Sequence, residues 1–265
     1  MIGFIGVGNM GGTLARAAIR AVGAENVLVS SRTLEKAQRF AADTGCTAVM
    51  NTETAARAQV LFLGVKPQGM RSMLAKIAPV LQARSDRFVL VSMAAGLSLQ
   101  QITDFSGGAY PILRIMPNTP AAVGEGMIPY CANELASSED AAELCRILQP
   151  AGRLDPLPEH LIDAAGALSG CGPAFVYVFL EALADAAVAC GMPRDKAIQY
   201  AAQTALGSAK LVLQTGTHPA ALKDAVCSPA GSTIRGVHAL EAGGFRAAAE
   251  NAVLAAYERS MELGK

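Results

Sequence analysis

The sequence carries no net charge, no tryptophan and few aromatic side chains. Lys plus Arg and Asp plus Glu both number 22 among the 265 residues, and aromatic residues make up only 5%. Proteins that hold a nucleic-acid backbone need a basic excess, and those that stack on bases need aromatic side chains. We therefore expect no nucleic-acid partner.

Signals for export and membrane insertion are missing as well. The first cation, Arg16, follows the apolar opening residues, whereas a signal peptide places its cations before them. No apolar run approaches the ~18 residues that a membrane span needs. Residues 173–192 come closest, but Glu181 and Asp185 interrupt them, and they are typical of a buried helix. We expect a cytoplasmic protein that does not associate with membranes.

Patterns for disulfides and metal binding are equally scarce. The six cysteines include no Cys-x-x-Cys pair, and the three histidines (His160, His218 and His238) lie far apart in the sequence. This spacing does not suit a metal site, and without an export signal the thiols are expected to be reduced. The histidines are interpreted as structural or solvated.

What the sequence does contain, in its first half, is an alternation of short apolar runs with stretches of helical periodicity. Alternation of this kind indicates βαβ units and a parallel sheet, so we expect an α/β, Rossmann-like domain over residues 1–152. The expected strands are 2–6, 27–30, 60–65, 88–92 and 112–116, and the expected helices are 10–22, 34–44 and 70–81.

The pattern changes at a cluster of proline and glycine over residues 150–158. Beyond it no segment reads as a strand, and residues 153–265 are expected to form an all-α domain. Its alanine-rich helices permit close packing, which favours a helix–helix interface between subunits. The expected helices are 164–190 with a break near 170–173, then 194–214, 220–226, 229–241 and 245–263, the last ending at Gly264.

A glycine motif follows the first expected strand and opens the first helix. Gly6-Val7-Gly8-Asn9-Met10-Gly11 fits G-x-G-x-x-G, the dinucleotide-binding pattern. In that pattern the first glycine permits the tight turn, the second lets the backbone approach the pyrophosphate, and the third allows close packing of helix on strand. The free N–H groups of the helix start then bind the phosphates.

The end of the second expected strand indicates which cofactor is used. An NAD enzyme places Asp or Glu there to accept from the ribose 2′-hydroxyl, but this chain has Ser30-Ser31-Arg32. A hydroxyl followed by a guanidinium suits a 2′-phosphate. The residues favour NADPH over NADH, and a solvated strand-end arginine is the alternative.

A second anion site is suggested by residues 228–233. Ser228 followed by Pro229 is a typical helix start, and Gly231 leaves the backbone N–H groups open to a small carboxylate. The residues alone favour a plain helix cap, and the carboxylate site stays open as the alternative at this point.

Segments along the whole chain, in order, are similar to those of one family. They are 2–10, 65–68, 94–96, 114–120, 168–175, and 222–234 with Leu240-Glu241 and residues 243–245. Together they resemble the pyrroline-5-carboxylate reductases. The resemblance implies reduction of L-1-pyrroline-5-carboxylate to L-proline with NADPH, NADH being possible, as the last step of proline synthesis. It also implies a homodimer joined through the C-terminal helices, with a decamer possible.

The resemblance further implies roles for individual residues. Asn51 lies near the adenosine ribose, Val65-Lys66-Pro67 lies along the cofactor, and Ala94-Ala95-Gly96 lies beside the nicotinamide. Ser228, Gly231, Ser232 and Thr233 form the substrate turn, in which Thr233 bonds the ring nitrogen. The chain departs from the family pattern at three positions: Ala230, Ser232 and Cys171 stand where Gly, Thr and Ser are frequent.

Two alternatives remain. A 3-hydroxyacid dehydrogenase shares a Rossmann domain followed by helices, but it uses a lysine on the first long helix of the second domain, and residues 170–190 contain neither Lys nor Arg. A non-catalytic NADP-binding sensor would not need the turn at residues 228–233.

Overall fold

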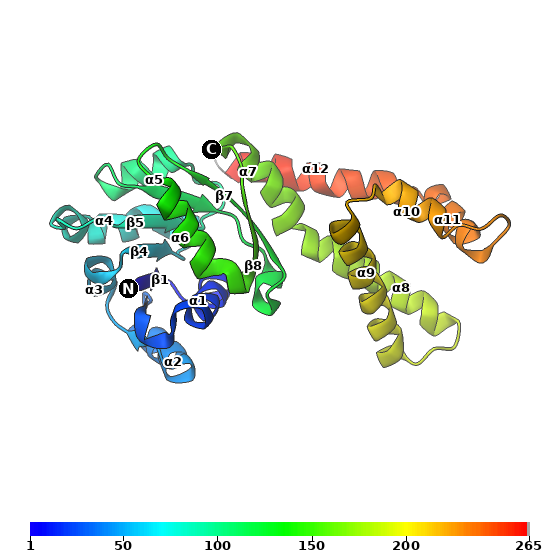
Figure 1. Ribbon diagram of the computed structural model, residues 1–265, viewed down its shortest axis with the longest axis horizontal. Helices are drawn as coiled ribbons and strands as arrows, with labels where there is room; N and C mark the ends of the chain where they lie inside the picture. The colour runs from blue at the N-terminus through cyan, green and yellow to red at the C-terminus, as the bar shows by residue number, and fades with distance from the viewer. Residues whose placement is uncertain (264–265) are drawn as a thin grey trace. The chain divides into compact units, whose positions relative to one another are not determined.

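The computed structural model describes residues 1–263, and Gly264 therefore lies outside the described residues. The chain divides into two compact units (Figure 1). The first contains residues 1–171 together with 256–263, and the second contains residues 172–255. The expected boundary at 152/153 falls inside the last strand of the first unit.

The first unit is built on an eight-stranded sheet with the order β3-β2-β1-β4-β5-β6-β7-β8 (Figure 1). All neighbouring strands are parallel except β6 and β7, which are antiparallel. The strands are β1 (Ile2–Ile5), β2 (Val27–Ser30), β3 (Thr47–Ala48), β4 (Val60–Leu63), β5 (Val89–Ser92), β6 (Ile112–Ile115), β7 (Gly126–Ala132) and β8 (Gly152–Pro156).

Helices cover both faces of this sheet, which is why its central strands are continuous apolar runs. Every residue of β1, β2, β4, β5 and β6 is buried, and Phe4 stacks on Phe62 of the adjacent strand with 4.4 Å between ring centroids. One face packs on α1 (Asn9–Val22), α2 (Leu34–Thr44) and α6 (Ser138–Leu148); the other packs on α3 (Asn51–Arg57), α4 (Pro67–Gln82), α5 (Leu99–Ser106) and α7 (Glu159–Ala165).

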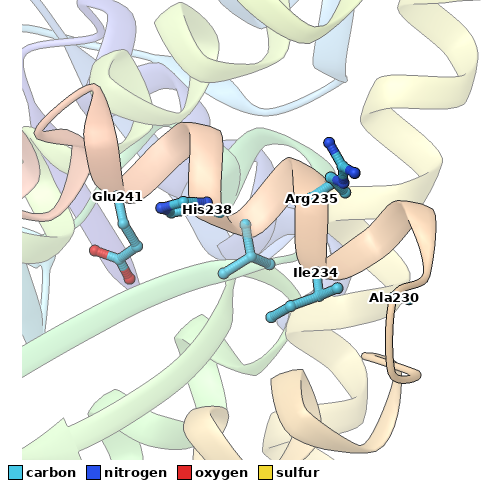
Figure 2. Close-up of a pocket in the computed structure, with 6 residues that line it drawn as sticks. Ala230, Ile234, Arg235, His238 and Glu241 are labelled. Atoms are coloured by element: carbon cyan, nitrogen blue, oxygen red, sulfur yellow. The ribbon is translucent and has the colours of Figure 1, made fainter.

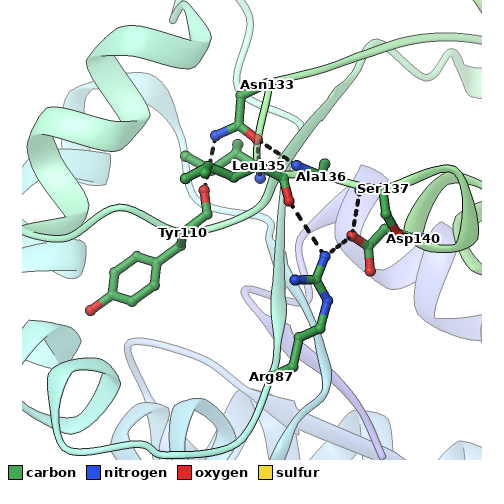
Figure 3. A network of polar contacts seen from close by, with 8 residues as sticks. Arg87, Tyr110, Asn133, Leu135, Ala136, Ser137 and Asp140 are labelled. Atoms are coloured by element: carbon green, nitrogen blue, oxygen red, sulfur yellow. Dashed lines mark hydrogen bonds and ion pairs between the residues drawn. The ribbon is translucent and has the colours of Figure 1, made fainter.

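A polar network fixes the antiparallel end of the sheet (Figure 3). Asn133, just after β7, donates to the Tyr110 carbonyl (2.9 Å) and accepts from the Ile112 N–H (3.0 Å). Arg87 pairs with Asp140 at 2.5 Å, and the Asp140 carboxylate also caps α6 by accepting from the Ser137 N–H. The chain is thereby held to β6 as it leaves β7 and enters α6.

A π-helical segment, η4 (Gly166–Gly170), follows α7 and precedes α8 (Gly172–Ala189). Pro173 has no N–H to offer the carbonyl of Ser169 four residues earlier. The side chain of Asn118 donates to that carbonyl instead (2.9 Å), while its oxygen accepts from the Met127 N–H (3.0 Å). The break that the sequence predicts near 170–173 is therefore a change of helix type, with its free carbonyl satisfied from the first unit.

The second unit is entirely helical and has almost no core of its own. It comprises α8, α9 (Arg194–Thr215), α10 (Pro219–Ala225), α11 (Ser232–Ala242) and the first part of α12 (Phe245–Leu263). Only Ala184, Ala197 and Ala201 are buried within residues 172–255. The expectation of a buried helix at 173–192 is wrong for a single chain, because Tyr177 and Val178 of α8 are 60% and 67% exposed.

One stretch in the described part of the chain, Glu159–Ala189, is long and apolar enough to cross a membrane by length and composition. This stretch is longer than the apolar run seen in the sequence, because the π-helical segment joins α7 to α8 across the expected break. Of its most apolar part, 11% is buried in the single chain. A helix at an interface between protein chains can have the same length and composition, so these two properties alone do not indicate a membrane span.

The expected strands and helices are confirmed to within a few residues. Within residues 1–263 no strand follows β8, as expected for the second half. Not anticipated were β3, α3, α5, β7, α6, β8 and most of α7 (Glu159–Ala165), which begins five residues before the helix expected at 164. The last strand was missed because prolines surround it, and β7 contains Pro129, which the sequence pattern treats as a strand breaker.

Candidate functional site

Four neighbouring parallel strands end in register at one edge of the sheet. Their last residues, Ser30, Ile5, Leu63 and Ser92, pair across β2, β1, β4 and β5. In open α/β sheets, ligands bind outside the carboxyl ends of the strands where the strand order reverses, which here is between β1 and β4. The loops that leave this edge carry Ser31-Arg32, Gly6 to Gly11, Val65-Lys66-Pro67 and Ala94-Ala95-Gly96.

The glycine motif places backbone against backbone at this edge. Gly6 has a φ of 105°, and a Cβ on Gly11 would lie 2.1 Å from the Gly6 carbonyl oxygen. Gly64, after β4, is packed equally tightly, since its Cβ would lie 2.4 Å from the same oxygen. Gly64 was not among the predicted site residues, although a glycine in an apolar run signals a close backbone approach.

Gly8 differs from its neighbours because it faces open space. A Cβ there would meet no described atom within 4 Å. Gly8 is also the N-cap of α1, whose first turn has no acidic residue, and its carbonyl accepts from the Gly12 N–H (2.7 Å). The N–H groups of Asn9, Met10 and Gly11 precede that first helical bond and are free for an anion. This surface fits a pyrophosphate.

Ser31 and Arg32 follow β2 directly. Ser30 is buried and donates its hydroxyl to the Phe4 carbonyl (3.4 Å), so the strand end itself is occupied by a small side chain. Arg32 is exposed, and no ion pair ties it to any other described residue. Its guanidinium is therefore available to an anionic group at this edge.

Asn51 is the first residue of α3, after β3, which pairs with β2. Its side-chain oxygen is buried and has no hydrogen-bond partner among residues 1–263. A buried acceptor without a partner is costly, so this atom suits a hydroxyl donor from a ligand. The orphaned oxygen and the open Gly8 are independent signs that a dinucleotide fits this edge.

The remaining two loops complete the edge. Lys66 is exposed at the N-cap of α4, and Pro67 is the first residue of that helix, where a missing N–H costs nothing. After β5, the Ala94 N–H donates to the Ser92 hydroxyl (3.4 Å), and Gly96 turns the chain with a φ of 74°. Val65 is half-buried, and Ala95 is exposed.

The predicted substrate turn lies in the second unit, and its helix starts later than the sequence indicates. The helix start expected at Ser228 is wrong: α11 begins at Ser232, and Gly231 is its N-cap. Residues 228–231 instead form a turn in which the Gly231 N–H donates to the Ser228 carbonyl (3.0 Å). Pro229 in second place and a positive φ in third place are typical of a type II turn.

Because α11 begins at Ser232, its free backbone N–H donors include those of Ser232 and Thr233. These N–H groups lie in the first turn of α11, which contains no acidic residue, and the N-cap glycine has no side chain to bond them. The Ser228 hydroxyl lies beside Gly231, since a Cβ on that glycine would be 2.4 Å from its oxygen. The arrangement can hold a small carboxylate, and Thr233 is exposed in the single chain.

A groove of 360 Å³ runs from this turn along one face of α11 (Figure 2). Glu241 at its far end pairs with Arg246 at 2.5 Å, and this hydrogen bond holds the pKa of the Glu241 carboxyl below its usual value. Its lining residues are Ala230, Ile234, Arg235, Val237, His238 and Glu241.

Metal ligation is not evident in the described part of the chain. No three His, Cys, Asp or Glu side chains of residues 1–263 lie close enough together to hold a metal ion. Cys131, on β7, is the thiol nearest to the buried charges of the first unit, and burial raises its pKa to about 11. It is therefore protonated at neutral pH and a poor nucleophile.

Comparison with known proteins identifies the family. Residues 159–263 match the family model for pyrroline-5-carboxylate reductase dimerisation, and residues 1–96 match that for NADP oxidoreductase, coenzyme F420-dependent. A pyrroline-5-carboxylate reductase of Glycine max is 41% identical over 99% of this chain and 95% of its own length. Pyrroline-5-carboxylate reductase 3 of Rattus norvegicus is 42% identical over 100% and 96%. This chain belongs to the pyrroline-5-carboxylate reductase family.

Solved structures agree with this family membership. The pyrroline carboxylate reductase of Plasmodium falciparum, crystallised with NADP bound, has a TM-score of 0.88 and 33% identity, covering 100% of this chain and 98% of its own. The 3-hydroxyisobutyrate dehydrogenase of Mycobacterium tuberculosis reaches 0.52 at 17% identity over 72% of this chain. That likeness shows a shared fold alone, so the dehydrogenase alternative shares the architecture but not the family.

Ala230 gives the first testable prediction, because it is a non-glycine residue with a positive φ (58°). An L-residue pays about 1 kcal/mol or more for this conformation, which glycine avoids. Ala230→Gly should therefore raise the melting temperature by about 2–4 °C at fixed protein concentration. The matched control is Ala221→Gly at the third residue of α10, which should lower the melting temperature by a similar amount. A lower melting temperature for Ala230→Gly would contradict the assigned turn.

Proposed function

We propose that this chain reduces L-1-pyrroline-5-carboxylate to L-proline with NADPH. The proposal rests on two binding sites, one in each unit of a chain that is related to these reductases over its whole length. The first unit has the sheet edge with its open Gly8 and orphaned Asn51 oxygen. The second unit has the start of α11, whose free N–H groups suit a small carboxylate.

NADPH supplies the hydride, and the sheet edge of the first unit would bind this cofactor. The N–H groups of Asn9, Met10 and Gly11 would bind the pyrophosphate, with Val7 buried beneath the turn. Asn51 would accept from the adenosine ribose, and Ser31 with Arg32 would bind the 2′-phosphate. Val65, Lys66 and Pro67 would lie along the cofactor, and residues 94–96 beside the nicotinamide. NADH, lacking the 2′-phosphate, would forgo only the contacts to Ser31 and Arg32.

The start of α11 would hold the substrate. Its N–H groups at Ser232 and Thr233, together with the Ser228 hydroxyl, bind the carboxylate, while Gly231 leaves the backbone accessible. The reaction adds a hydride to C5 and a proton to the ring nitrogen. A protonated imine is already electrophilic, so positioning dominates, and the Thr233 hydroxyl orients the nitrogen.

The second unit is proposed to pack against a second copy. Residues 172–255 bury only three alanines, whereas a stable domain needs a hydrophobic core. The matching family model is itself described by dimerisation and covers residues 159–263. A homodimer through the C-terminal helices would cover the exposed face of α8, and such dimers can build a decamer. We also propose that the protein acts in the cytoplasm.

The activity is tested by NADPH oxidation with and without pyrroline-5-carboxylate, with proline measured as product. The wild type should form one proline per NADPH oxidised, whereas a non-catalytic sensor would form none. Thr233→Val keeps the shape and removes the hydroxyl, so turnover should fall by an amount equivalent to about 1–3 kcal/mol while NADPH binding stays unchanged. Thr204→Val, on α9, makes the same change outside the site and should leave turnover intact. Normal turnover by Thr233→Val would remove Thr233 from the site.

Arg32 is predicted to select the cofactor. Arg32→Ala should raise the Michaelis constant for NADPH by about tenfold or more, because a hydrogen bond to a charged group is worth ~1.5–3 kcal/mol, and should leave that for NADH unchanged. Arg39→Ala removes another exposed arginine of the same region, on α2, and serves as the control. Equal effects of Arg32→Ala on both cofactors would show that Arg32 does not read the 2′-phosphate.

Assembly is tested by a charge placed on α8. Val178→Glu should dissociate the protein in sedimentation at micromolar concentration and lower its melting temperature, because a buried carboxylate would lie in the interface. Val123→Glu, at an apolar position of the first unit that is more exposed than Val178 (77% against 67%), should leave assembly unchanged. The wild-type melting temperature should also rise with protein concentration. A folded, active wild-type monomer would refute the proposed dimer.

A further inference from the structure

The first unit contains a buried arginine that touches none of the proposed ligand-binding residues. Arg114, on β6, has a side chain only 3% exposed. Its Nη2 pairs with Asp163 at 2.5 Å, and its Nη1 lies 3.6 Å from Glu159 Oε1. Both carboxylates stand on α7, four residues apart and therefore on the same face of the helix.

A charge so deeply buried is expensive to keep and is retained only with well-placed partners. The Nε atom of Arg114 even lacks a hydrogen-bond partner within residues 1–263. An apolar residue in this otherwise apolar strand would avoid that cost. The arginine is therefore better explained by what it holds in place than by stability.

The group that Arg114 helps to position is the Glu159 carboxylate, which makes a second contact. Glu159 Oε1, the atom that faces Arg114, also accepts from the Leu99 N–H at 2.7 Å. Leu99 is the first residue of α5, so this N–H has no partner within its own helix. Ser98 and Gln101 close the same helix start with a capping box at 3.1 and 2.9 Å. Glu159 adds a tie from this helix start to α7.

The start of α5 is also one end of the short loop that connects β5 to α5. Residues 94–97 run between Ser92, the last residue of β5, and Ser98, the cap of α5. The other end is held by the Ala94 N–H on the Ser92 hydroxyl. The position of this loop over the sheet edge therefore depends on both anchors, and Arg114 acts on one of them through Glu159.

We propose that Arg114 is a positioning residue, which through Glu159 fixes the start of α5 and with it the loop 94–97 beside the nicotinamide. This inference rests on the proposed function for the placement of the nicotinamide at that loop. It predicts that the adenosine end of the cofactor binds normally when the relay is broken, while the reacting end is held less well.

The test uses the full-length enzyme and four variants. Arg114→Met and Glu159→Ala break the relay and should lower kcat by about tenfold or more, with the KM for NADPH within about twofold of wild type. Glu159→Gln keeps an oxygen for the Leu99 N–H and should retain most of kcat. Asp163→Asn is the matched control, because it removes the nearer ionic partner of Arg114 without touching Leu99. It should lower the melting temperature and leave kcat near the wild-type value.

Two further readouts separate positioning from loss of folded protein. With NADPH deuterated at the transferred position, the isotope effect on kcat should increase in Arg114→Met and Glu159→Ala, whereas a smaller folded fraction leaves it unchanged. The fluorescence enhancement per bound NADPH should fall in the same two variants.

The outcomes distinguish this inference from the proposed function. No proline formation by the wild type would refute the function, and the NADPH fluorescence of the variants would still decide the inference. Wild-type fluorescence and isotope effects in Glu159→Ala would overturn the inference. The inference would also be overturned if kcat fell as much in Glu159→Gln as in Glu159→Ala. The oxygen that accepts from the Leu99 N–H would then not determine the activity.

Discussion

The contact on which the sheet edge depends is the approach of two backbone segments without side chains between them. Gly6 and Gly64 directly follow the neighbouring strands β1 and β4, and Gly11 lies in the first turn of α1. A Cβ on each of these glycines would lie 2.1–2.5 Å from a carbonyl oxygen. Any side chain would force the helix away from the sheet. The direction of the α1 N-terminus, the openness of Gly8 and the spacing of the neighbouring loops all follow from this packing.

The two proposed binding sites are supported in different ways. The cofactor site rests on buried parallel strands in register, so its loops start from fixed points. The substrate site rests on α11, in a unit whose buried residues are three alanines. Within one chain the first site is therefore positioned by a core of its own, whereas the second has almost none. In the proposed homodimer, positioning of the substrate would depend on assembly as well as on folding.

Much of this could be predicted from the sequence where a pattern is local. Buried strands such as β4 are continuous apolar runs, and the glycine motif lies between a strand and a helix. The α11 start was misplaced because Ser228-Pro229 is also a good helix start, and only the backbone shows Ala230 in a left-handed turn. Asn51 could be assigned only by resemblance. Its helix, α3, is seven residues long, which is too short to show a clear helical periodicity in the sequence. The Arg114 relay joins residues 15 to 60 positions apart, although an arginine within an apolar strand signals that a partner must exist.

The exposed face of α8 has a consequence for the newly made chain. In the proposed homodimer a second copy covers it, and before that the chain presents a helical stretch with the length and composition of a membrane span. Such a surface attracts lipids, chaperones and other unfolded chains as readily as its proper partner. The encounter of two copies is second order in chain concentration, while capture by those competitors is not. The yield of active enzyme should therefore fall disproportionately when synthesis is slow, which makes the rate of production itself a determinant of activity.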